Sequence, residues 1–277
     1  MGQIMTGRVG LIGDPVEHSL SPVFQQAAFD ALGIDVRYEL WQTPVEAIPE
    51  RLAALRSGEI HCANVTVPHK ETFFQVVDER TPLAMRVGAV NTLIVREGRI
   101  FGENTDVYGF LHPLRERDFP FQESDAIVLG AGGAARGVVV GLLGAGIRLV
   151  IVANRTLRRA EALRGDLADE RISACMLADV SAHVERALLV VNATALGWQA
   201  EELPIDHALF AQLPSGALAY DLTYRETPFL AAAASTGLDT LDGLPMLIHQ
   251  GARSFEFWTG VSAPVKVMWD AVRAALR

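Results

Sequence analysis

The chain has 277 residues, of which 50% are hydrophobic and 21% charged, and its net charge is −9. This length and composition are typical of a globular protein with two domains and a large core. The acidic balance argues against a nucleic-acid or anionic-membrane partner, because both reward basic surfaces. Cys62 and Cys175 lie far apart and outside any metal-binding spacing, so we expect no disulfide framework, no metal site and a reducing, cytoplasmic setting.

The first hundred residues alternate short β-branched runs with helical patterns. We predict strands at 9–12, 36–40 and 62–67, helices at 22–32, 45–56 and 71–77, and a hairpin of strands 92–95 and 99–101. The hairpin turns at Glu97-Gly98, and an amphipathic helix follows at 105–117. Such alternation indicates a mainly parallel sheet with helices on both faces.

The rest of the chain continues this alternation. We predict strands at 126–129, 149–153, 188–192 and 217–221 with helices between them, and two last helices at 246–258 and 265–276. Residues 126–153 are strongly apolar, but Arg136 and Arg148 interrupt them, so no membrane span is expected. The prediction is an α/β protein with an N-terminal, mainly parallel domain at 1–104, onto which 245–277 pack back, and a doubly wound, Rossmann-type domain at 105–244.

A glycine-rich turn follows the first strand of the second domain, in the sequence Gly130-Ala131-Gly132-Gly133-Ala134-Ala135. A first glycine permits the turn, a second lets the backbone approach a pyrophosphate, and the helix N-terminus supplies amide donors. The pattern therefore predicts a dinucleotide site. The alternative is that these glycines only allow a helix to pack tightly on a strand.

The end of the next strand decides which dinucleotide is expected. It reads Asn154-Arg155-Thr156, with Arg158 and Arg159 behind it and no carboxylate before Glu161. An NAD site expects an acidic residue here for the ribose 2′-hydroxyl, whereas arginines form charge-assisted bonds to a 2′-phosphate. We therefore predict NADP, with a solvated basic helix start as the alternative.

Polar residues also follow the strands of the first domain. Ser19 and Ser21 lie two apart in an extended loop, where they can bind a carboxylate or diol; the alternative is capping, with Ser21 as N-cap. Asn64 and Thr66 alternate onto one face at a strand end, where ligands bind in open α/β sheets.

Lys70 and Asp106 each close a short polar motif. A lysine that gives a proton, a carboxylate that orients it and a bound nicotinamide would make an alcohol dehydrogenase that needs no metal. The alternatives are a surface lysine that opens a helix and a first-turn aspartate favoured by the helix dipole.

Together these motifs resemble the shikimate dehydrogenase family. The matching segments are His-Ser-Leu-Ser-Pro at 18–22, Asn-Val-Thr-Val-Pro-x-Lys at 64–70, Gly-Ala-Val-Asn-Thr at 88–92, Gly-x-Asn-Thr-Asp at 102–106, Gly-Ala-Gly-Gly-Ala at 130–134, Asn-Arg-Thr at 154–156 and Gln-Gly-Ala at 250–252. The resemblance implies an NADP-dependent oxidoreductase that reversibly reduces 3-dehydroshikimate to shikimate, in the shikimate pathway of aromatic amino-acid biosynthesis.

The resemblance also implies roles for particular residues. Lys70 would be the proton donor and acceptor, supported by Asp106. The substrate-binding residues would be Ser19, Ser21, Asn64, Thr66, Asn91, Tyr224 and Gln250. The residues that bind NADP(H) would be Gly130, Ala131, Gly132, Gly133, Ala134, Asn154, Arg155, Thr156 and Arg159. We expect small molecules as the only ligands, with the chain a monomer or a homodimer.

Two positions depart from the family pattern. His69 stands where the family commonly has Phe before the lysine, and we expect it to be an exposed histidine at a helix start rather than a second proton carrier. The segment from Asp221 to Thr227-Pro228 is two residues shorter than usual, which leaves the orientation of Tyr224 open.

Three other functions are compatible with parts of this pattern. A quinate/shikimate dehydrogenase that uses NAD is disfavoured by Arg155, and a non-catalytic NADP-binding sensor by the presence of Lys70 and Asp106. A different two-domain dehydrogenase, such as a methylene-tetrahydrofolate enzyme, should lack the two-serine loop.

Overall fold

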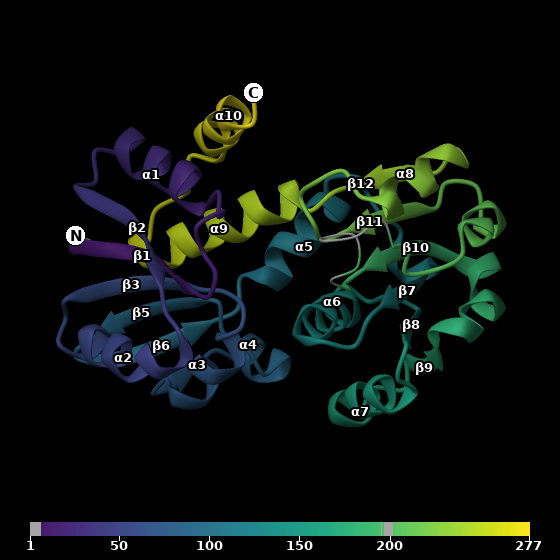
Figure 1. Cartoon of the computed structure of the whole chain (residues 1–277), viewed down its shortest axis with the longest axis horizontal. Helices are drawn as coiled ribbons and strands as arrows, with labels where there is room; N and C mark the ends of the chain where they lie inside the picture. The colour runs from purple at the N-terminus through teal and green to yellow at the C-terminus, as the bar shows by residue number, and fades with distance from the viewer. Residues whose placement is uncertain (1–6, 195, 197–201) are drawn as a thin grey trace. The chain divides into compact units, whose positions relative to one another are not determined.

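A computed structural model of the chain describes residues 7–194, 196 and 202–277 (Figure 1). The chain divides into two compact units, Met1–Gly109 with Ile248–Arg277, and Phe110–Leu247. It passes from the first unit to the second within helix α5 (Asp106–Arg115) and returns within helix α9 (Leu244–Thr259). Each unit has its own sheet and its own core.

The first unit contains a six-stranded sheet in the order β2-β1-β3-β5-β6-β4. Its strands are β1 (Gly7–Gly13), β2 (Val36–Gln42), β3 (Ile60–Val65), β4 (Glu79–Arg80), β5 (Thr92–Arg96) and β6 (Arg99–Glu103). β1 pairs in parallel with β2 and β3, and β4 with β6, whereas β5 is antiparallel to both of its neighbours. The predicted β5–β6 hairpin is confirmed, and its turn residues Glu97 and Gly98 have φ of 52° and 74°, as a tight hairpin requires.

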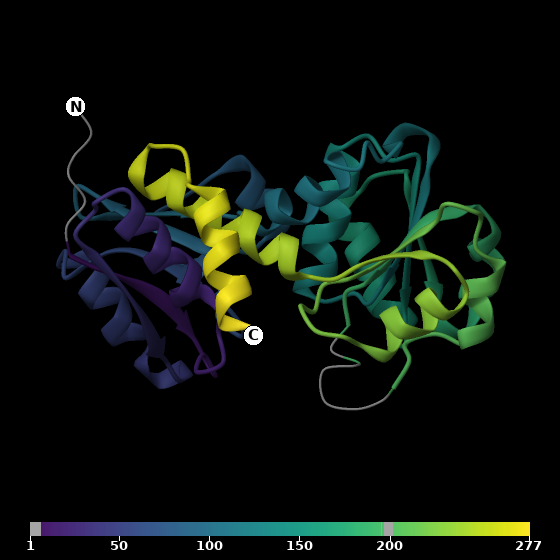
Figure 2. The same ribbon diagram turned by 90° about the horizontal axis from the view of Figure 1, so that it is seen from above.

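Helices cover both faces of this sheet (Figures 1 and 2). They are α1 (Ser21–Ala31), α2 (Ile48–Arg56), α3 (Lys70–Val76), α4 (Pro82–Val87), α9 and α10 (Val265–Ala275). Side chains of α2, α3 and α4 share one buried cluster with Ile12, Val65 and Leu93 of the strands. The opposite face is covered by α1 and α9, whose Phe29 and Phe255 rings lie 5.0 Å apart.

The helix predicted at 45–56 is in fact a 3₁₀ turn, η1 (Val45–Ala47), followed by α2. Pro49 explains the difference, because it has no N–H with which to bond the carbonyl of Val45 four residues earlier. Instead the N–H of Ile48 bonds that carbonyl and closes the tighter turn.

The second unit contains a six-stranded, entirely parallel sheet in the order β12-β11-β10-β7-β8-β9. The strands are β7 (Asp125–Leu129), β8 (Leu149–Asn154), β9 (Ile172–Met176), β10 (Ala187–Asn192), β11 (Leu218–Asp221) and β12 (Asp239–Leu241). The helical segments are η2 (Phe121–Glu123), α6 (Gly133–Gly144), α7 (Leu157–Leu167), η3 (Leu177–Arg186), η4 (His207–Gln212) and α8 (Pro228–Ser235). The predicted doubly wound arrangement is confirmed.

Burial on both faces explains the apolar strands of this sheet. Ile127 and Leu129 of β7 share a core with Phe210 and Phe229 on one face, while Val128 is fully buried on the other. The apolar stretch 126–153 forms β7, α6 and β8. Among the residues that the structure describes, no helix is long and apolar enough to cross a membrane.

Gly251 allows α9 to lie close to α1. A Cβ added to Gly251 would lie 2.3 Å from Cε2 of Phe24, and the Gly251 carbonyl accepts a hydrogen bond of 2.9 Å from Gln25. We expect Gly251→Ala to destabilise the protein by about 1–3 kcal/mol, because a core this tight does not accept an extra methyl group. Urea titration followed by tryptophan fluorescence measures the loss.

Gly165→Ala is the matched control, since a Cβ on this exposed α7 residue has no atom within 4 Å. It should be stabilising by about 0.5–1 kcal/mol, the usual helix preference of alanine over glycine. A Gly251→Ala protein as stable as the parent would show that the α1–α9 contact is loose.

Candidate active site

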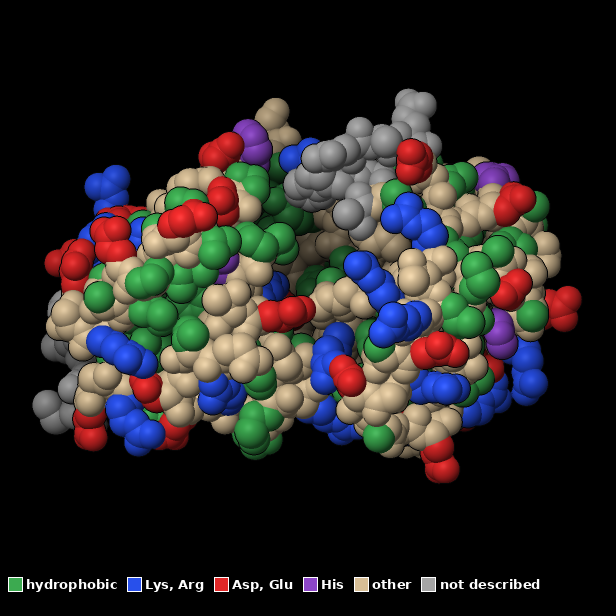
Figure 3. All heavy atoms as spheres, turned by 60° about the horizontal axis from the view of Figure 1, so that its bottom comes forward, with side chains coloured by type: hydrophobic (Ala, Val, Ile, Leu, Met, Phe, Trp, Pro, Cys, Tyr) green, Lys and Arg blue, Asp and Glu red, His purple; other side chains and the backbone are tan. Residues whose placement is uncertain are grey.

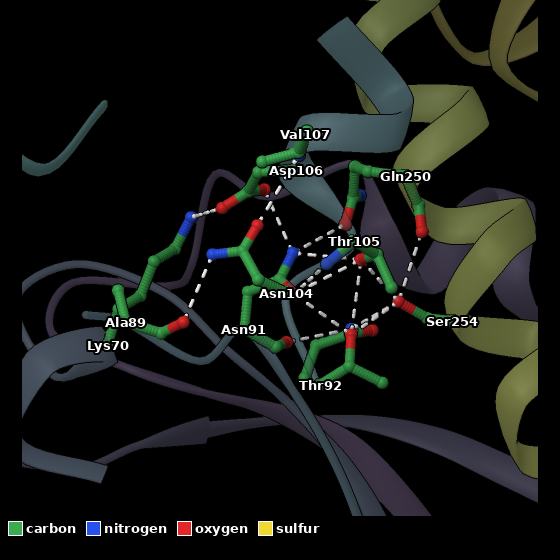
Figure 4. A network of polar contacts seen from close by, with 11 residues as sticks. Lys70, Ala89, Asn91, Thr92, Asn104, Thr105, Asp106, Val107, Gln250 and Ser254 are labelled. Atoms are coloured by element: carbon green, nitrogen blue, oxygen red, sulfur yellow. Dashed lines mark hydrogen bonds and ion pairs between the residues drawn. The ribbon is translucent and has the colours of Figure 1, made fainter. Parts of the chain in front are cut away.

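Lys70 and Asp106 form an ion pair in the first unit (Figure 4). Lys70 is the first residue of α3 and Asp106 the first of α5. Lys70 Nζ lies 2.7 Å from Asp106 Oδ2, and the two side chains are 30% and 20% exposed. The two motifs therefore bring an amine and a carboxylate together where a small molecule can still reach them.

Asn91 holds the second oxygen of that carboxylate. Its amide nitrogen donates to Asp106 Oδ1 at 2.9 Å, to Thr105 Oγ1 at 2.9 Å and to Gln250 Oε1 at 3.3 Å. Its amide oxygen accepts from the backbone N–H of Thr105 at 2.8 Å. Asp106 therefore has a different donor on each oxygen, which fixes the plane of the carboxylate.

A buried cluster of hydroxyls lies beside Asn91. Ser254, Thr92 and Thr105 are fully buried, and Ser254 Oγ is 2.7 Å from Thr92 Oγ1 and 3.0 Å from Thr105 Oγ1. Sequence reasoning missed all three as members of the site. The signal for Ser254 is its position one helical turn after Gln250, so that α9 presents both side chains to the same place (Figure 4).

Asn64 connects this cluster to strand β2. Its amide nitrogen donates to Ser254 Oγ at 3.0 Å and to the Asn91 carbonyl at 3.1 Å. Its amide oxygen accepts from the phenol of Tyr38 at 2.9 Å. Burial raises the pKa of Tyr38, so the phenol keeps its proton and remains a donor. Sequence reasoning also missed Tyr38, which lies on a strand that carries none of the predicted site residues.

The two serines lie at the start of α1, and the expectation that Ser21 is its N-cap is wrong. Leu20, not Ser21, occupies the N-cap position of α1, and no side chain caps it. Ser19 Oγ accepts a hydrogen bond of 3.1 Å from the N–H of Ser21, and the Ser21 side chain lies close enough to the Tyr38 phenol to oppose the rise that burial causes in its pKa. Thr66 is half-buried and follows the last residue of β3. Its backbone N–H donates to the carbonyl of Ile12.

His69 is buried, so the expectation of an exposed histidine is wrong. It is 1% exposed, and its Nε2 lies 2.6 Å from the carbonyl oxygen of Thr43. A carbonyl only accepts, so Nε2 carries the proton. The helix start at Lys70 turns His69 inward, where it ties the beginning of α3 to the end of β2.

The second unit carries the predicted glycine-rich turn between β7 and α6. Gly130 has φ of 110°, and a Cβ on it would lie 3.1 Å from the carbonyl oxygen of Ala193. Only glycine meets both conditions. The next residues, Gly132, Gly133 and Ala134, are exposed at the start of α6. This turn fits a dinucleotide, because exposed backbone N–H groups at a helix N-terminus bind phosphate.

Three arginines follow the end of β8. Arg155, Arg158 and Arg159 are exposed and form no ion pair with any residue that the structure describes. By contrast, Arg136 pairs with Asp166 at 2.9 Å and Arg148 with Asp125 at 2.7 Å. Figure 3 looks onto the side of the second unit where α7 lies, and basic side chains gather there. These arginines fit the 2′-phosphate of NADP, since no carboxylate neutralises them.

Tyr224 belongs to the second unit, in the loop between β11 and α8. It is half-buried, and burial raises the pKa of its phenol. The short segment that contains it ends at Thr227, whose hydroxyl caps α8 and donates to Asp221 at 2.8 Å.

The parallel sheet and its glycine-rich turn define a dinucleotide-binding α/β protein. Three family models match the chain: "Shikimate dehydrogenase substrate binding domain" over residues 11–93, "Shikimate / quinate 5-dehydrogenase" over 114–205 and "Shikimate 5'-dehydrogenase C-terminal domain" over 243–273.

Individual relatives agree with these models. A protein of Symbiobacterium thermophilum named shikimate dehydrogenase (NADP(+)) is 41% identical over 98% of this chain and 95% of its own length. Among solved structures, the Aquifex aeolicus shikimate dehydrogenase has a TM-score of 0.90 at 32% identity, covering 99% and 100% of the two chains. The Thermus thermophilus shikimate 5-dehydrogenase in complex with NADP(H) and shikimate has a TM-score of 0.86 at 39% identity, covering 97% and 99%.

The chain therefore belongs to the shikimate dehydrogenase family, as the sequence motifs predicted. The predicted fold class is confirmed as well.

Ser254→Ala tests the buried cluster. It would remove the hydroxyl that accepts from Asn64 and bonds to Thr92 and Thr105. We expect a loss of about 1–3 kcal/mol in the free energy of unfolding, the cost of leaving buried polar groups without a partner. Ser57→Ala is the control, because this exposed hydroxyl bonds, among the described residues, only to the Ala54 carbonyl and the N–H of Glu59. It should change stability by less than about 0.5 kcal/mol. Equal effects of the two substitutions would contradict the cluster's role.

Proposed function

We propose that this chain catalyses the reversible, NADP-dependent reduction of 3-dehydroshikimate to shikimate. The observation that carries the proposal is the partly exposed Lys70–Asp106 ion pair, with Nζ 2.7 Å from Oδ2, at the edge of a buried polar cluster. Two findings support the proposal. The Symbiobacterium thermophilum relative is named shikimate dehydrogenase (NADP(+)), and the Thermus thermophilus structure is a complex with NADP(H) and shikimate.

The residues of the pair can move a proton at a defined atom. When bound, NADPH supplies the hydride that reaches the ketone carbon. Lys70 Nζ gives a proton to the oxygen of that ketone as negative charge develops on it, which leaves a neutral amine. Asp106 orients the ammonium, and Asn91 holds the carboxylate in turn. In the opposite direction the neutral amine takes the hydroxyl proton of shikimate, so oxidation requires Lys70 to be uncharged.

The composition of the chain supports a proton-transferring role for Lys70. Only two of its 24 basic residues are lysines, Lys70 and Lys266, and all the others are arginines. An arginine at position 70 would form the same ion pair, but a guanidinium does not give up its proton in a protein. An amine stands at the one position where the proposed mechanism needs a group that can be deprotonated.

We assign the substrate to the first unit and NADP(H) to the second. The proposed substrate residues of the first unit are Ser19, Ser21, Asn64, Thr66, Asn91 and Gln250, to which Tyr224 of the second unit is added. The proposed cofactor residues are Gly130 to Ala134, Asn154, Arg155, Thr156 and Arg159. Asn154 is already oriented, since its amide donates to the carbonyl of Thr156 at 2.9 Å. Cytoplasmic location and a monomeric or homodimeric state complete the proposal.

Quinate is a second candidate substrate, because one matching family model is described as shikimate / quinate 5-dehydrogenase. Nicotinamide absorbance, recorded with shikimate and with quinate in the presence of each oxidised cofactor, separates the possibilities. Fast reduction of NADP⁺ by shikimate alone supports the proposal. Tight NADP binding without turnover of either substrate would instead support a sensor.

Lys70→Arg and Lys70→Ala test the proton transfer. We expect each to lower kcat by about 10²–10⁴, the usual contribution of a general acid–base group, with NADP affinity nearly unchanged. Steady-state kinetics and NADP titration by fluorescence measure both quantities. Lys266→Ala is the control, because the Lys266 side chain is 89% exposed and, within the part of the chain that the structure describes, pairs only with Asp270 one turn along α10. A Lys70→Arg protein with near-normal kcat would exclude proton transfer by this residue.

Arg155→Ala tests the choice of cofactor. Loss of a charge-assisted bond to the 2′-phosphate should reduce the preference for NADP over NAD by about tenfold to a hundredfold, with NAD binding little changed. The ratio of the two dissociation constants measures this. Arg164→Ala, on the exposed surface of α7, should leave the ratio as it is. An unchanged ratio in Arg155→Ala would assign NADP selectivity to other residues.

A further inference from the structure

Tyr38, on β2, hydrogen-bonds to Asn64 of the proposed substrate site and lies near a second proposed substrate residue, Ser21. Its phenol donates to Asn64 Oδ1 at 2.9 Å, and the Ser21 side chain is close enough to the same phenol to oppose the rise that burial causes in its pKa. The Tyr38 ring is 5% exposed and lies against that of Trp258, with 6.4 Å between ring centroids. Tyr38 therefore connects the start of α1 with the end of β3.

The phenol decides how the Asn64 amide is oriented. The carbonyl of Asn91 only accepts hydrogen bonds, so the NH₂ group of Asn64 must face it. The amide oxygen then points toward Tyr38, which supplies its donor. An amide oxygen accepts two hydrogen bonds, so one lone pair of Asn64 Oδ1 remains for a ligand hydroxyl. Without the phenol, the oxygen would be buried without a protein donor and the amide less restrained.

We propose that Tyr38 is a positioning residue of the substrate site, whose phenol holds Ser21 and Asn64 in the conformations that bind a hydroxylated carboxylic acid. The inference rests on the proposed function, because it takes shikimate as that acid. Tyr38 acts through Ser21 and Asn64 and forms no hydrogen bond with Lys70 in the part of the chain that the structure describes. Its effect should therefore fall on substrate binding rather than on the chemical step.

Tyr38→Phe removes the hydroxyl and keeps the ring that packs on Trp258. We expect KM for shikimate to rise about tenfold, which corresponds to the loss of about one hydrogen bond's net free energy. Both kcat and KM for NADP should stay within about twofold of the parent values, since binding is lost equally in the ground and transition states.

Tyr220→Phe is the matched control for deleting a buried phenol oxygen. Tyr220 is fully buried, and its hydroxyl has no hydrogen-bond partner among the described residues. It stacks on Phe110 with 5.2 Å between centroids, in the second unit. This variant should retain the parent KM for shikimate, so a rise confined to Tyr38→Phe separates positioning from general loss of packing.

A double-mutant cycle with Ser21→Ala tests the connection itself. If Tyr38 acts through Ser21, KM for shikimate in the double variant will not rise by the product of the factors measured in the two single variants. A second measurement is the rise in melting temperature when shikimate is added. Because each protein is compared with its own ligand-free value, this rise reports shikimate binding even where a variant is less stable. It should be smaller for Tyr38→Phe than for the parent, while the rise with NADP is unchanged.

The outcomes distinguish the inference from the function on which it rests. A parent protein that does not oxidise shikimate overturns both. A parent protein that does so, with an unchanged KM and an unchanged shikimate melting shift in Tyr38→Phe, overturns only the role of Tyr38. A fall in kcat at constant KM, or independent effects in the cycle, also overturns it.

Discussion

The side-chain amide of Asn91 is the contact on which the arrangement of the first unit depends. The amide nitrogen of this side chain donates to Asp106, and its amide oxygen accepts from the N–H of Thr105. The backbone carbonyl of Asn91 accepts from the side chain of Asn64. Segments far apart in the sequence therefore meet at one 2% exposed residue. In a low-dielectric interior these bonds are strong, and each unpaired member would be costly, so the network has one favourable arrangement. The Lys70–Asp106 pair is positioned by that constraint before any ligand binds.

The second unit is prepared for its ligand in a different way. Its features are backbone ones: the positive φ of Gly130, its contact with the Ala193 carbonyl, and the exposed start of α6. The charges beside it, on Arg155 and its neighbours, are exposed and unpaired among the described residues. The first unit thus contains a buried, hydrogen-bonded polar network, whereas the second exposes N–H groups and positive charge of the kind that binds phosphates. Substitutions in the first unit should therefore couple function to stability more strongly.

Sequence patterns were sufficient for the long elements and failed where tertiary contacts override local signals. Strands β1, β7 and β10 carry apolar runs, and these strands and β3 were predicted within a few residues. The edge strands β4, β9 and β12 were not predicted. β4 and β12 are only two and three residues long, and β9 is mostly half-buried and lacks the apolar run of a central strand. The burial of His69 was missed for a related reason. A polar residue before a helix reads as exposed, and only the Thr43 carbonyl beside it shows why burial is tolerated.

The sequence by itself determined the fold class, the dinucleotide turn, the family, and Lys70 and Asp106 as candidates. These follow from periodicity, from glycines that a turn requires, and from motifs whose spacing is set by strands that end at one edge of a sheet. Only the tertiary structure decided that Lys70 and Asp106 touch, that Ser254, Thr92 and Thr105 join Asn64 beside them, and that the Tyr38 phenol donates to Asn64. Those contacts join residues tens to hundreds of positions apart, and hydrogen bonds between buried side chains leave no periodic trace in the chain.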